Sequence, residues 1–221
     1  MPRVEGFIFD LDGTLLDTLD DIVDAGNSVL SQLGITPVDK EHYREFIGDG
    51  VNELFRKLLE YRKALSEEKL QICVSLMKEA YSKNYLNKTR PYDGIYEMLD
   101  YLYRNNYKLS ILSNKQHFFT NELVKHFFSN FKFVVVRGIE SSEDRKPNPR
   151  LAIEIANTMG IPPQKIMFVG DSINDIITAR NCEMIPVGVS WGFKNYEEIL
   201  SYKPSYILNN PMDIRRILEE Y

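Results

Sequence analysis

Six short apolar runs are spread along the chain, and their length is typical of strands buried within a sheet. Between most of them, apolar residues recur three or four positions apart, as they do from Ile95 to Leu102. Strands that alternate with helices predict an α/β fold, in which helices cover both faces of a parallel sheet. The predicted strands are Gly6–Phe9, Lys108–Leu112, Phe133–Val136, Lys165–Val169, Ile185–Val189 and Tyr206–Leu208.

Residues 18–86 break this alternation, because helical patterns follow one another there without a strand pattern. Thr18 followed by Asp21 resembles a capping box, although Glu or Gln is the usual fourth residue. Asp39 and Ser66 are predicted to cap two later helices of this region. We therefore expect an all-helical insertion directly after the first strand.

The chain of 221 residues is long enough for one large domain, or for one domain with a small insertion, and for a sizeable core. Its 27 Lys and Arg residues against 32 Asp and Glu residues give a net charge of −5. This mild acidity argues against nucleic acid or an anionic membrane surface as a partner. It is compatible with a small anionic substrate, because the charge near the site matters more than the total.

Cysteine usage favours a reducing location. Cys73 and Cys182 are far apart, without a CxxC pair or a His spacing suited to zinc, and are predicted to be buried thiols. No apolar stretch approaches the roughly 20 residues of a membrane span, and the N-terminus lacks the pattern of a signal peptide. We expect a cytoplasmic protein, and the sequence leaves its oligomeric state open.

Polar side chains follow three of the predicted strands. Asp10 follows the first strand, Ser113 and Asn114 follow the second, and Asp171 follows the fourth. Taken singly, each is best explained as a cap of the next helix. Ligands bind outside the carboxyl ends of the strands in open parallel sheets, so the three together predict a site for a metal ion or phosphate.

Four motifs in this order resemble those of the haloacid dehalogenase-like phosphotransferase superfamily. They are DLDGT at Asp10–Thr14, Ser113 after a strand, Lys146 followed by Pro147, and GDSIND at Gly170–Asp175. Their order and approximate spacing agree over the whole chain, whereas an isolated DxD would be weak evidence. The resemblance implies a Rossmann-like parallel sheet core, over residues 1–15 and 88–221, with an inserted all-helical cap domain over residues 16–87.

The resemblance also implies roles for individual residues. Asp10 would be the nucleophile that forms an aspartyl-phosphate, and Asp12 would be the general acid and base. Lys146 would neutralise both Asp10 and the phosphate. The expected cofactor is Mg²⁺, a hard ion that takes oxygen ligands. The implied phosphate-binding residues are Gly13, Ser113, Asn114 and Lys146, and the implied metal ligands are Asp10, the backbone carbonyl of Asp12, Asp171 and Asp175.

Asp175 has two interpretations. It follows Asp171 by four residues, so both carboxylates lie on one helix face if the helix has already begun there. Asp175 would then support the metal ion or its water ligands. Alternatively, it is an ordinary acidic residue of a first helical turn, favoured by the helix dipole. We favour the first interpretation.

Asp12 also distinguishes two reactions, because the true dehalogenases of the superfamily lack an acid at this position. Its presence favours phosphoryl transfer.

The stretches FIGDGVNEL and GVSWGFKN resemble phosphoglycolate phosphatases. Gly48 and Gly50 either present backbone amides to a small carboxylate or only turn one helix into the next. We expect an Mg²⁺-dependent phosphatase that hydrolyses a small phosphorylated metabolite, with 2-phosphoglycolate as the first candidate.

Other functions are compatible with these motifs. Pyrophosphatases and nucleotidases of the superfamily share the same features, and a β-phosphoglucomutase-like enzyme would return the phosphoryl group to another sugar hydroxyl. Phosphonate hydrolysis would require a cap lysine that forms a Schiff base. A silent binding module is disfavoured, because it has no chemical need for both acids and Lys146. Trp191 is expected to pack, with lining of the site as the alternative.

Overall fold

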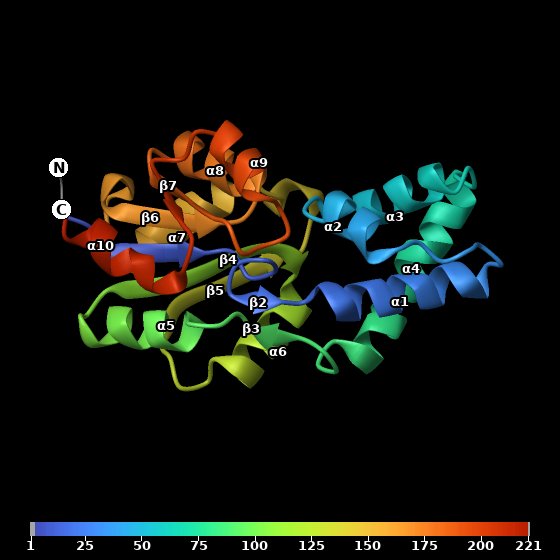
Figure 1. Cartoon of the computed structure of the whole chain (residues 1–221), viewed down its shortest axis with the longest axis horizontal. Coiled ribbons are helices and arrows are strands. Elements are labelled where there is room, and N and C mark those ends of the chain that lie inside the picture. Colours follow the sequence, from blue (N-terminus) through green and yellow to red (C-terminus); the bar gives the residue numbers. More distant parts are fainter. Residues whose placement is uncertain (1–2, 221) are drawn as a thin grey trace. The chain divides into compact units, whose positions relative to one another are not determined.

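A computed structural model describes residues 3–220 and divides the chain into two compact units. The first comprises Met1–Leu16 and Pro91–Tyr221, and the second comprises Asp17–Arg90. Figure 1 shows the elements of both. The strands are β1 Gly6–Phe9, β2 Leu16–Asp17, β3 Arg90–Pro91, β4 Lys108–Gln116, β5 Phe133–Ile139, β6 Ile166–Gly170, β7 Ile185–Val189 and β8 Tyr206–Leu208. The α-helices are α1 Leu19–Gln32, α2 Lys40–Phe46, α3 Gly50–Tyr61, α4 Glu67–Asn84, α5 Ile95–Arg104, α6 His117–Phe127, α7 Arg150–Met159, α8 Ile173–Asn181, α9 Tyr196–Ser201 and α10 Ile214–Leu218. Short 3₁₀ helices cover Ser142–Asp144, Pro163–Lys165 and Pro211–Asp213.

A six-stranded parallel sheet forms the centre of the first unit, in the order β5-β4-β1-β6-β7-β8. The predicted parallel α/β fold is confirmed. The chain places β4 and β5 on one side of β1 and the later strands on the other. The strand order therefore reverses between β1 and β6, and ligands bind outside the carboxyl ends of strands at such a point.

β4 is longer than the sequence pattern predicts. It continues through Gln116, so that Ser113 and Asn114 belong to the strand instead of following it. The reason is the pairing with β5, which also extends further, to Ile139, and brings Gln116 opposite Ile139. β1 ends earlier, with Phe9 opposite Ile111. The end of β4 therefore projects beyond the end of β1.

Helices cover both faces of this sheet. Figure 1 shows α5 and α6 on the opposite side of the sheet from α7 and α8. A buried apolar cluster joins α7 and α8 to the central strands, and it includes Ile8 of β1, Leu112 of β4 and Phe168 of β6. Burial of such continuous apolar surface is the main stabilising contribution to an α/β core. This core holds the strand ends in fixed register.

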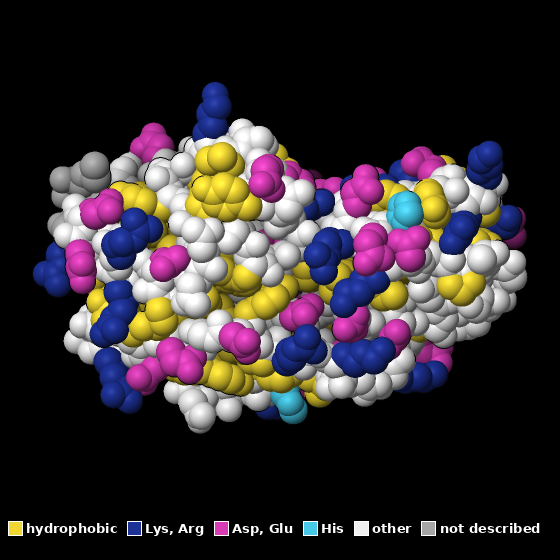
Figure 2. Space-filling view, in the orientation of Figure 1, with side chains coloured by type: hydrophobic (Ala, Val, Ile, Leu, Met, Phe, Trp, Pro, Cys, Tyr) yellow, Lys and Arg dark blue, Asp and Glu magenta, His cyan; other side chains and the backbone are white. Residues whose placement is uncertain are grey.

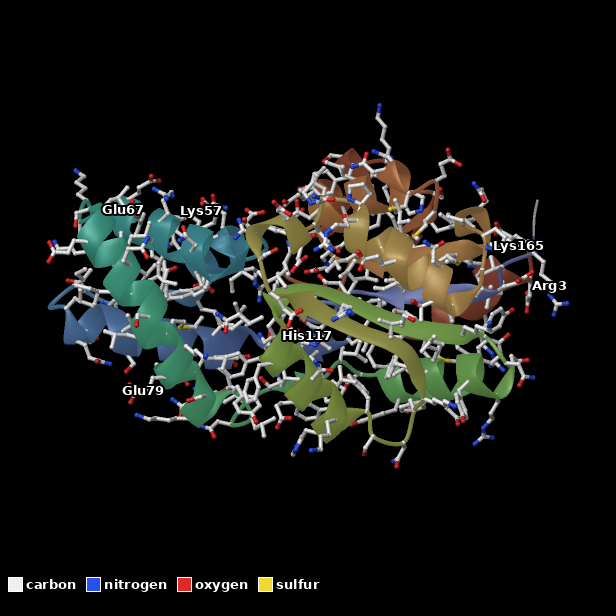
Figure 3. All side chains as sticks on the ribbon, turned by 180° about the vertical axis from the view of Figure 1, so that it is seen from behind. Arg3, Lys57, Glu67, Glu79, His117 and Lys165 are labelled. Atoms are coloured by element: carbon white, nitrogen blue, oxygen red, sulfur yellow. The ribbon has the colours of Figure 1, made fainter. Side chains whose placement is uncertain are left out.

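Three polar side chains mark the two ends of the first unit. Figure 3 shows His117 at the start of α6, and Lys165 and Arg3 towards the opposite end. Lys165 Nζ lies 2.6 Å from Glu5 Oε1, and both side chains are partly exposed. His117 Nδ1 accepts a hydrogen bond of 3.2 Å from the Gly138 backbone amide. His117 thus connects α6 to β5.

The second unit is helical apart from its short terminal strands, as the sequence predicts. Asp39 accepts a hydrogen bond from the His42 amide, and Ser66 accepts one from the Lys69 amide, so both predicted caps are confirmed. Figure 3 shows Glu67 at the start of α4 and Glu79 farther along this helix.

The predicted capping box at Thr18 is wrong, because the side chain of Thr18 makes no capping hydrogen bond. The carboxylate of Asp21 instead accepts hydrogen bonds from the backbone amides of Lys88 and Thr89 and from the Thr89 hydroxyl. Asp21 is fully buried and thereby joins the two ends of this unit. A buried carboxylate needs such donors, and these outweigh local capping.

Several features of the surface and the interior agree with the composition. On the face seen in Figure 2, Lys and Arg side chains are interspersed with Asp and Glu side chains. Cys73 and Cys182 are buried and free, as predicted. Within residues 3–220, the helices lack the combination of length and hydropathy that a membrane span requires. Gly48 lies between α2 and α3, Gly50 is the first residue of α3, and both have positive φ.

Candidate active site

The site is built where β1 ends. Phe7, Ile8 and Phe9 are completely buried, and the backbone amide of Asp10 still bonds to the carbonyl of Val169 in the neighbouring strand β6. The sheet therefore carries Asp10 to the carboxyl edge, where its side chain is 10% exposed. Asp10 is held at this edge because the apolar strand before it is buried in the core.

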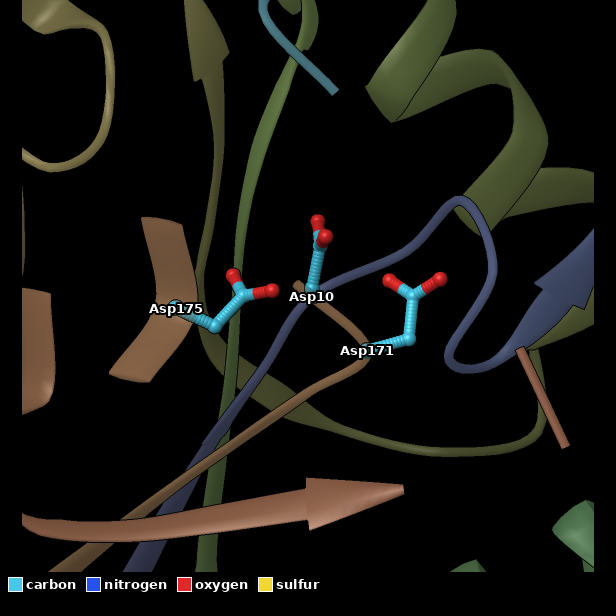
Figure 4. A group of neighbouring side chains, drawn as sticks. All are labelled: Asp10, Asp171 and Asp175. Carbon is cyan, nitrogen blue, oxygen red and sulfur yellow. The ribbon is translucent and has the colours of Figure 1, made fainter. Parts of the chain in front are cut away.

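Three carboxylates converge at this edge. Asp10, Asp171 and Asp175 each offer an oxygen, and these oxygens lie within 4.8 Å of one another. Figure 4 shows Asp10 between the other two, with Asp171 just after β6 and Asp175 on α8. Hard divalent cations prefer such oxygen ligands. The geometry therefore fits a divalent metal ion, and the carboxylate of Asp12 lies outside this group of described residues.

Lys146 provides a positive charge inside the cluster. Its Nζ lies 2.6 Å from Asp175 Oδ1 and 3.0 Å from Asp10 Oδ1, and the side chain is 2% exposed. Burial by itself lowers the pKa of Lys146, but the carboxylates of Asp10 and Asp175 more than offset this and raise it above the usual range. Lys146 is therefore a fixed cation that bridges two acids.

One lysine does not compensate the whole cluster. Burial raises the pKa of Asp10 to about 7; Asp175 and Asp12 add to this effect, and Lys146 opposes it. Burial also raises the pKa of Asp171 well above its usual range, and the charges of Asp10 and Asp175 contribute. Both shifts arise mainly from burial, and the charges of neighbouring carboxylates add to them. A divalent ion bound among these acids would favour their charged forms.

Asp175 belongs to the first turn of α8, which was the alternative interpretation of this residue. α8 begins at Ile173, so Asp171 precedes the helix and the two acids do not share a helix face. They meet because Asp171 leaves β6 beside the first turn of α8. Asp175 Oδ2 accepts hydrogen bonds from the amide and hydroxyl of Ser172, which closes a capping box. The other oxygen binds Lys146, so Asp175 caps α8 and also joins the cluster.

Asp171 is held by glycines that approach it closely. Gly13 has a φ of +80°, and a Cβ atom there would lie 2.2 Å from Asp171 Oδ2. A Cβ atom on Gly192 would lie 2.4 Å from the Cβ of Asp171. The backbone amide of Phe193 donates a hydrogen bond of 2.7 Å to Asp171 Oδ2. The motifs indicated Gly13, but no motif indicated Gly192 and Phe193, although both occur in the stretch GVSWGFKN.

Replacing Gly192 with Ala is expected to displace Asp171, because the new methyl group overlaps both the Gly13 carbonyl oxygen and Asp171. We expect a roughly 10- to 100-fold loss of metal affinity, as for other residues that orient a metal ligand. Isothermal titration with Mg²⁺ or Mn²⁺ measures this. Gly160→Ala is the control, since Gly160 has positive φ but open space around it. An unchanged affinity of Gly192→Ala would contradict the expectation.

Two motif residues lie on β4, and one of them, Asn114, contacts Lys146. The Asn114 side chain accepts a hydrogen bond of 2.8 Å from the Lys146 amide and donates one of 3.3 Å to the Lys146 carbonyl. The side chain of Asn114 thus fixes the backbone of Lys146, a role that the sequence did not indicate. Ser113 is buried, and its hydroxyl accepts a hydrogen bond from the Lys115 amide.

Asp12 lies in a tight loop, in which the Gly13 amide donates to the Leu16 carbonyl. Its carboxylate is bound by Lys115, whose Nζ lies 2.9 Å from one oxygen and 3.1 Å from the other. No pattern in the sequence indicated Lys115 as a site residue. Trp191 Nε1 donates to the carbonyl oxygen of Thr14, so Trp191 supports the loop through this contact.

Comparison with known proteins identifies the family. The model of the haloacid dehalogenase-like hydrolases matches residues 7–189. A phosphoglycolate phosphatase of Neisseria meningitidis is 34% identical over 86% of this chain and 82% of its own length. Phosphoglycolate phosphatase 1 of Pseudomonas aeruginosa is 29% identical over 97% of this chain and 79% of its own length. A crystal structure described as a predicted phosphoglycolate phosphatase from Haemophilus somnus superimposes with a TM-score of 0.90 at 27% identity, covering 98% of this chain and 99% of the other.

The fold is thus that of a hydrolase with a Rossmann-like core. This chain belongs to the haloacid dehalogenase-like hydrolase family. The resemblance noted in the sequence is confirmed.

Proposed function

We propose that this protein hydrolyses a small phosphate monoester through an aspartyl-phosphate on Asp10. The observation that carries the proposal is the environment of Asp10, which lies at the end of a buried strand. Lys146 Nζ is 3.0 Å away, Asp171 and Asp175 adjoin it, and Asp12 follows two residues later. A carboxylate nucleophile that attacks an anionic phosphate requires compensating positive charge at this point.

In the first step, a carboxylate oxygen of Asp10 attacks phosphorus, and the bond between phosphorus and the leaving oxygen breaks. Protonated Asp12 donates its proton to this leaving oxygen, so that an alcohol departs. Lys146 neutralises charge on Asp10 and the phosphate. The buried hydroxyl of Ser113, the backbone amides near Gly13 and the Asn114 backbone amide are the proposed phosphate donors.

In the second step, water attacks the phosphorus atom of the aspartyl-phosphate. Asp12, now a carboxylate, takes a proton from this water, and the bond between phosphorus and the Asp10 oxygen breaks. Inorganic phosphate leaves, and Asp10 and Asp12 return to their initial states. Two steps with the same acid and base replace one difficult displacement.

The donor set fits Mg²⁺, because it consists of carboxylate oxygens at a site whose acids lack a compensating cation. Asp10, the Asp12 carbonyl and Asp171 are the proposed direct ligands. Both oxygens of Asp175 already accept hydrogen bonds, which supports a role through metal-bound water. When bound, Mg²⁺ supplies positive charge that offsets the acids and the phosphate.

The proposed substrate is 2-phosphoglycolate. The support is the naming of relatives, including the Neisseria meningitidis protein that is 34% identical. In this proposal the helical insertion, expected over residues 16–87, acts as the cap domain that selects the substrate, and the partner of the protein is a small phosphorylated metabolite. The choice of 2-phosphoglycolate over other small phosphate esters rests on these relatives, because the same catalytic residues would act on any of these esters.

A substrate panel tests the proposal. With saturating Mg²⁺, kcat/KM is measured for 2-phosphoglycolate, pyrophosphate, nucleoside monophosphates, sugar phosphates and p-nitrophenyl phosphate. We expect 2-phosphoglycolate to exceed the other metabolites by at least about tenfold. A flat profile would overturn the substrate assignment, and conversion of β-glucose 1-phosphate to glucose 6-phosphate would indicate a mutase. No phosphate release from any compound would overturn the phosphatase itself.

Metal affinity is expected to depend on pH. The pKa of Asp10 is raised to about 7 without metal, so a proton competes with Mg²⁺ below that pH. One competing proton weakens the apparent affinity by about tenfold for each pH unit below about 7. Titration calorimetry at pH 5.5 and pH 8 in two buffers measures both the affinity and the proton release. Equal affinity at both values would refute this expectation.

The raised pKa of Asp10 also makes the stability of the metal-free protein depend on pH. The folded state keeps the proton of Asp10 at pH values where the unfolded state has lost it, so this group lowers the free energy of unfolding as pH rises from about 4 to about 7. Mg²⁺ is therefore expected to raise the unfolding temperature more at pH 8 than at pH 5.5. Differential scanning calorimetry with and without the ion checks this.

A further inference from the structure

A second buried lysine, Lys115, lies at the site, and the steps of the proposed reaction do not use it. Its Nζ is 2.9 Å and 3.1 Å from the two carboxylate oxygens of Asp12. The side chains of Lys115 and Asp12 are only 7% and 15% exposed, respectively. A contact to both oxygens restricts rotation of the carboxylate, and low exposure protects it from competing water.

The sheet register explains why this pair forms. β1 and β4 are parallel, with Phe9 opposite Ile111. Asp12 comes three residues after Phe9 and Lys115 comes four after Ile111, so the two continuations run side by side.

The two buried lysines divide the acids between them. Lys146 contacts Asp10 and Asp175, whereas Lys115 contacts Asp12. Lys115 therefore acts on the acid that transfers protons, while Lys146 acts on the acid that attacks. The separation has a chemical consequence, because a general acid must hold its proton within reach of one particular oxygen of the substrate.

We propose that Lys115 is a positioning residue for Asp12, holding its carboxylate in the orientation required for proton transfer to the leaving oxygen. This inference rests on the proposed phosphatase function. It concerns the step in which the leaving oxygen takes a proton, and Lys115 itself forms and breaks no covalent bond. A misplaced general acid slows only those reactions whose leaving group needs the proton.

The test compares Lys115→Met with wild type on two esters. 2-Phosphoglycolate releases a poor leaving group that needs a proton, whereas p-nitrophenyl phosphate releases a stable phenolate that does not. The parameter kcat/KM reports steps up to the release of this group. We expect Lys115→Met to lower kcat/KM about 10- to 100-fold for 2-phosphoglycolate, and less than about threefold for p-nitrophenyl phosphate.

A double-mutant cycle with Asp12→Asn separates positioning from other roles. We expect Lys115→Met to cost less than about threefold in the Asp12→Asn background, because the group that it positions is absent. Equal losses for both esters, or a full loss in that background, would overturn the proposal, since a lysine that binds the substrate or only supports the fold acts without Asp12. Wild-type protein inactive on both esters would instead refute the phosphatase function.

Two further variants keep the test decisive. Lys115→Gln retains a hydrogen-bond donor and is expected to recover part of the loss on 2-phosphoglycolate, which covers the case that Lys115→Met does not fold. Lys108→Met removes a lysine from the opposite end of the same strand, where its Nζ donates to the Met159 carbonyl. We expect Lys108→Met to keep wild-type kcat/KM on both esters.

Discussion

Replacing Asp10 with Asn is expected to lower kcat for phosphate release by about four orders of magnitude or more. Asn has nearly the same shape, but its amide cannot attack phosphorus and form the covalent intermediate. The fold should persist, because the substitution removes a buried negative charge whose pKa is already raised by burial. Steady-state phosphate release from 2-phosphoglycolate and p-nitrophenyl phosphate with saturating Mg²⁺ measures the effect.

Asp100→Asn is the matched control. Asp100 lies on α5 of the same unit, pairs with Arg104 at 2.9 Å and has a side chain that is 47% exposed. We expect this variant to keep wild-type kcat. If Asp10→Asn retained more than a few per cent of the rate, Asp10 would not be the nucleophile. Acid-quenched protein that still carries labelled phosphate after this substitution would lead to the same conclusion.

Replacing Lys146 with Met is expected to destabilise the metal-free protein by about 3–5 kcal/mol, the cost of leaving buried charges without their partner. For a chain of this size the unfolding temperature would fall by roughly 6–20 °C. The physical reason is that Lys146 is the cation within 3.0 Å of both Asp10 and Asp175. Calorimetric unfolding at pH 8 measures the loss, and kcat should also fall by at least about 100-fold.

Mg²⁺ provides an internal check on this explanation. If the loss reflects uncompensated carboxylates, added Mg²⁺ should restore more stability to Lys146→Met than it gives to wild type. Lys165→Met is the matched control, because Lys165 pairs with Glu5 at the surface, where such pairs contribute about 1 kcal/mol or less. Similar destabilisation of both lysine variants would show that the buried position of Lys146 has no special importance.

Both predictions follow from the same property of the site, which is an excess of buried negative charge at one edge of the sheet. Four carboxylates, those of Asp10, Asp12, Asp171 and Asp175, adjoin two lysines in a region of low exposure. Such an arrangement is costly without a cation and favourable with one. The free-energy cost of burying these carboxylates without a metal ion is therefore linked to the affinity of the site for the ion and for the phosphate.

Local patterns in the sequence were sufficient to predict the strands of the main sheet and two helix caps. All six strands of the six-stranded sheet occur where apolar runs predict them, and Asp39 and Ser66 cap their helices as expected. These features depend on residues a few positions apart, so periodicity and capping chemistry report them directly. The order and approximate spacing of the four motifs also indicated the family.

Only the tertiary structure decided which charges meet. Asp21 matched a capping pattern with Thr18, but it binds backbone amides 67 and 68 residues later. Asp12 pairs with Lys115 across 103 residues, through the register of two parallel strands. Sequence distance carries no information about such contacts. They are selected because a buried carboxylate requires a donor or a cation, and the fold determines which one is within reach.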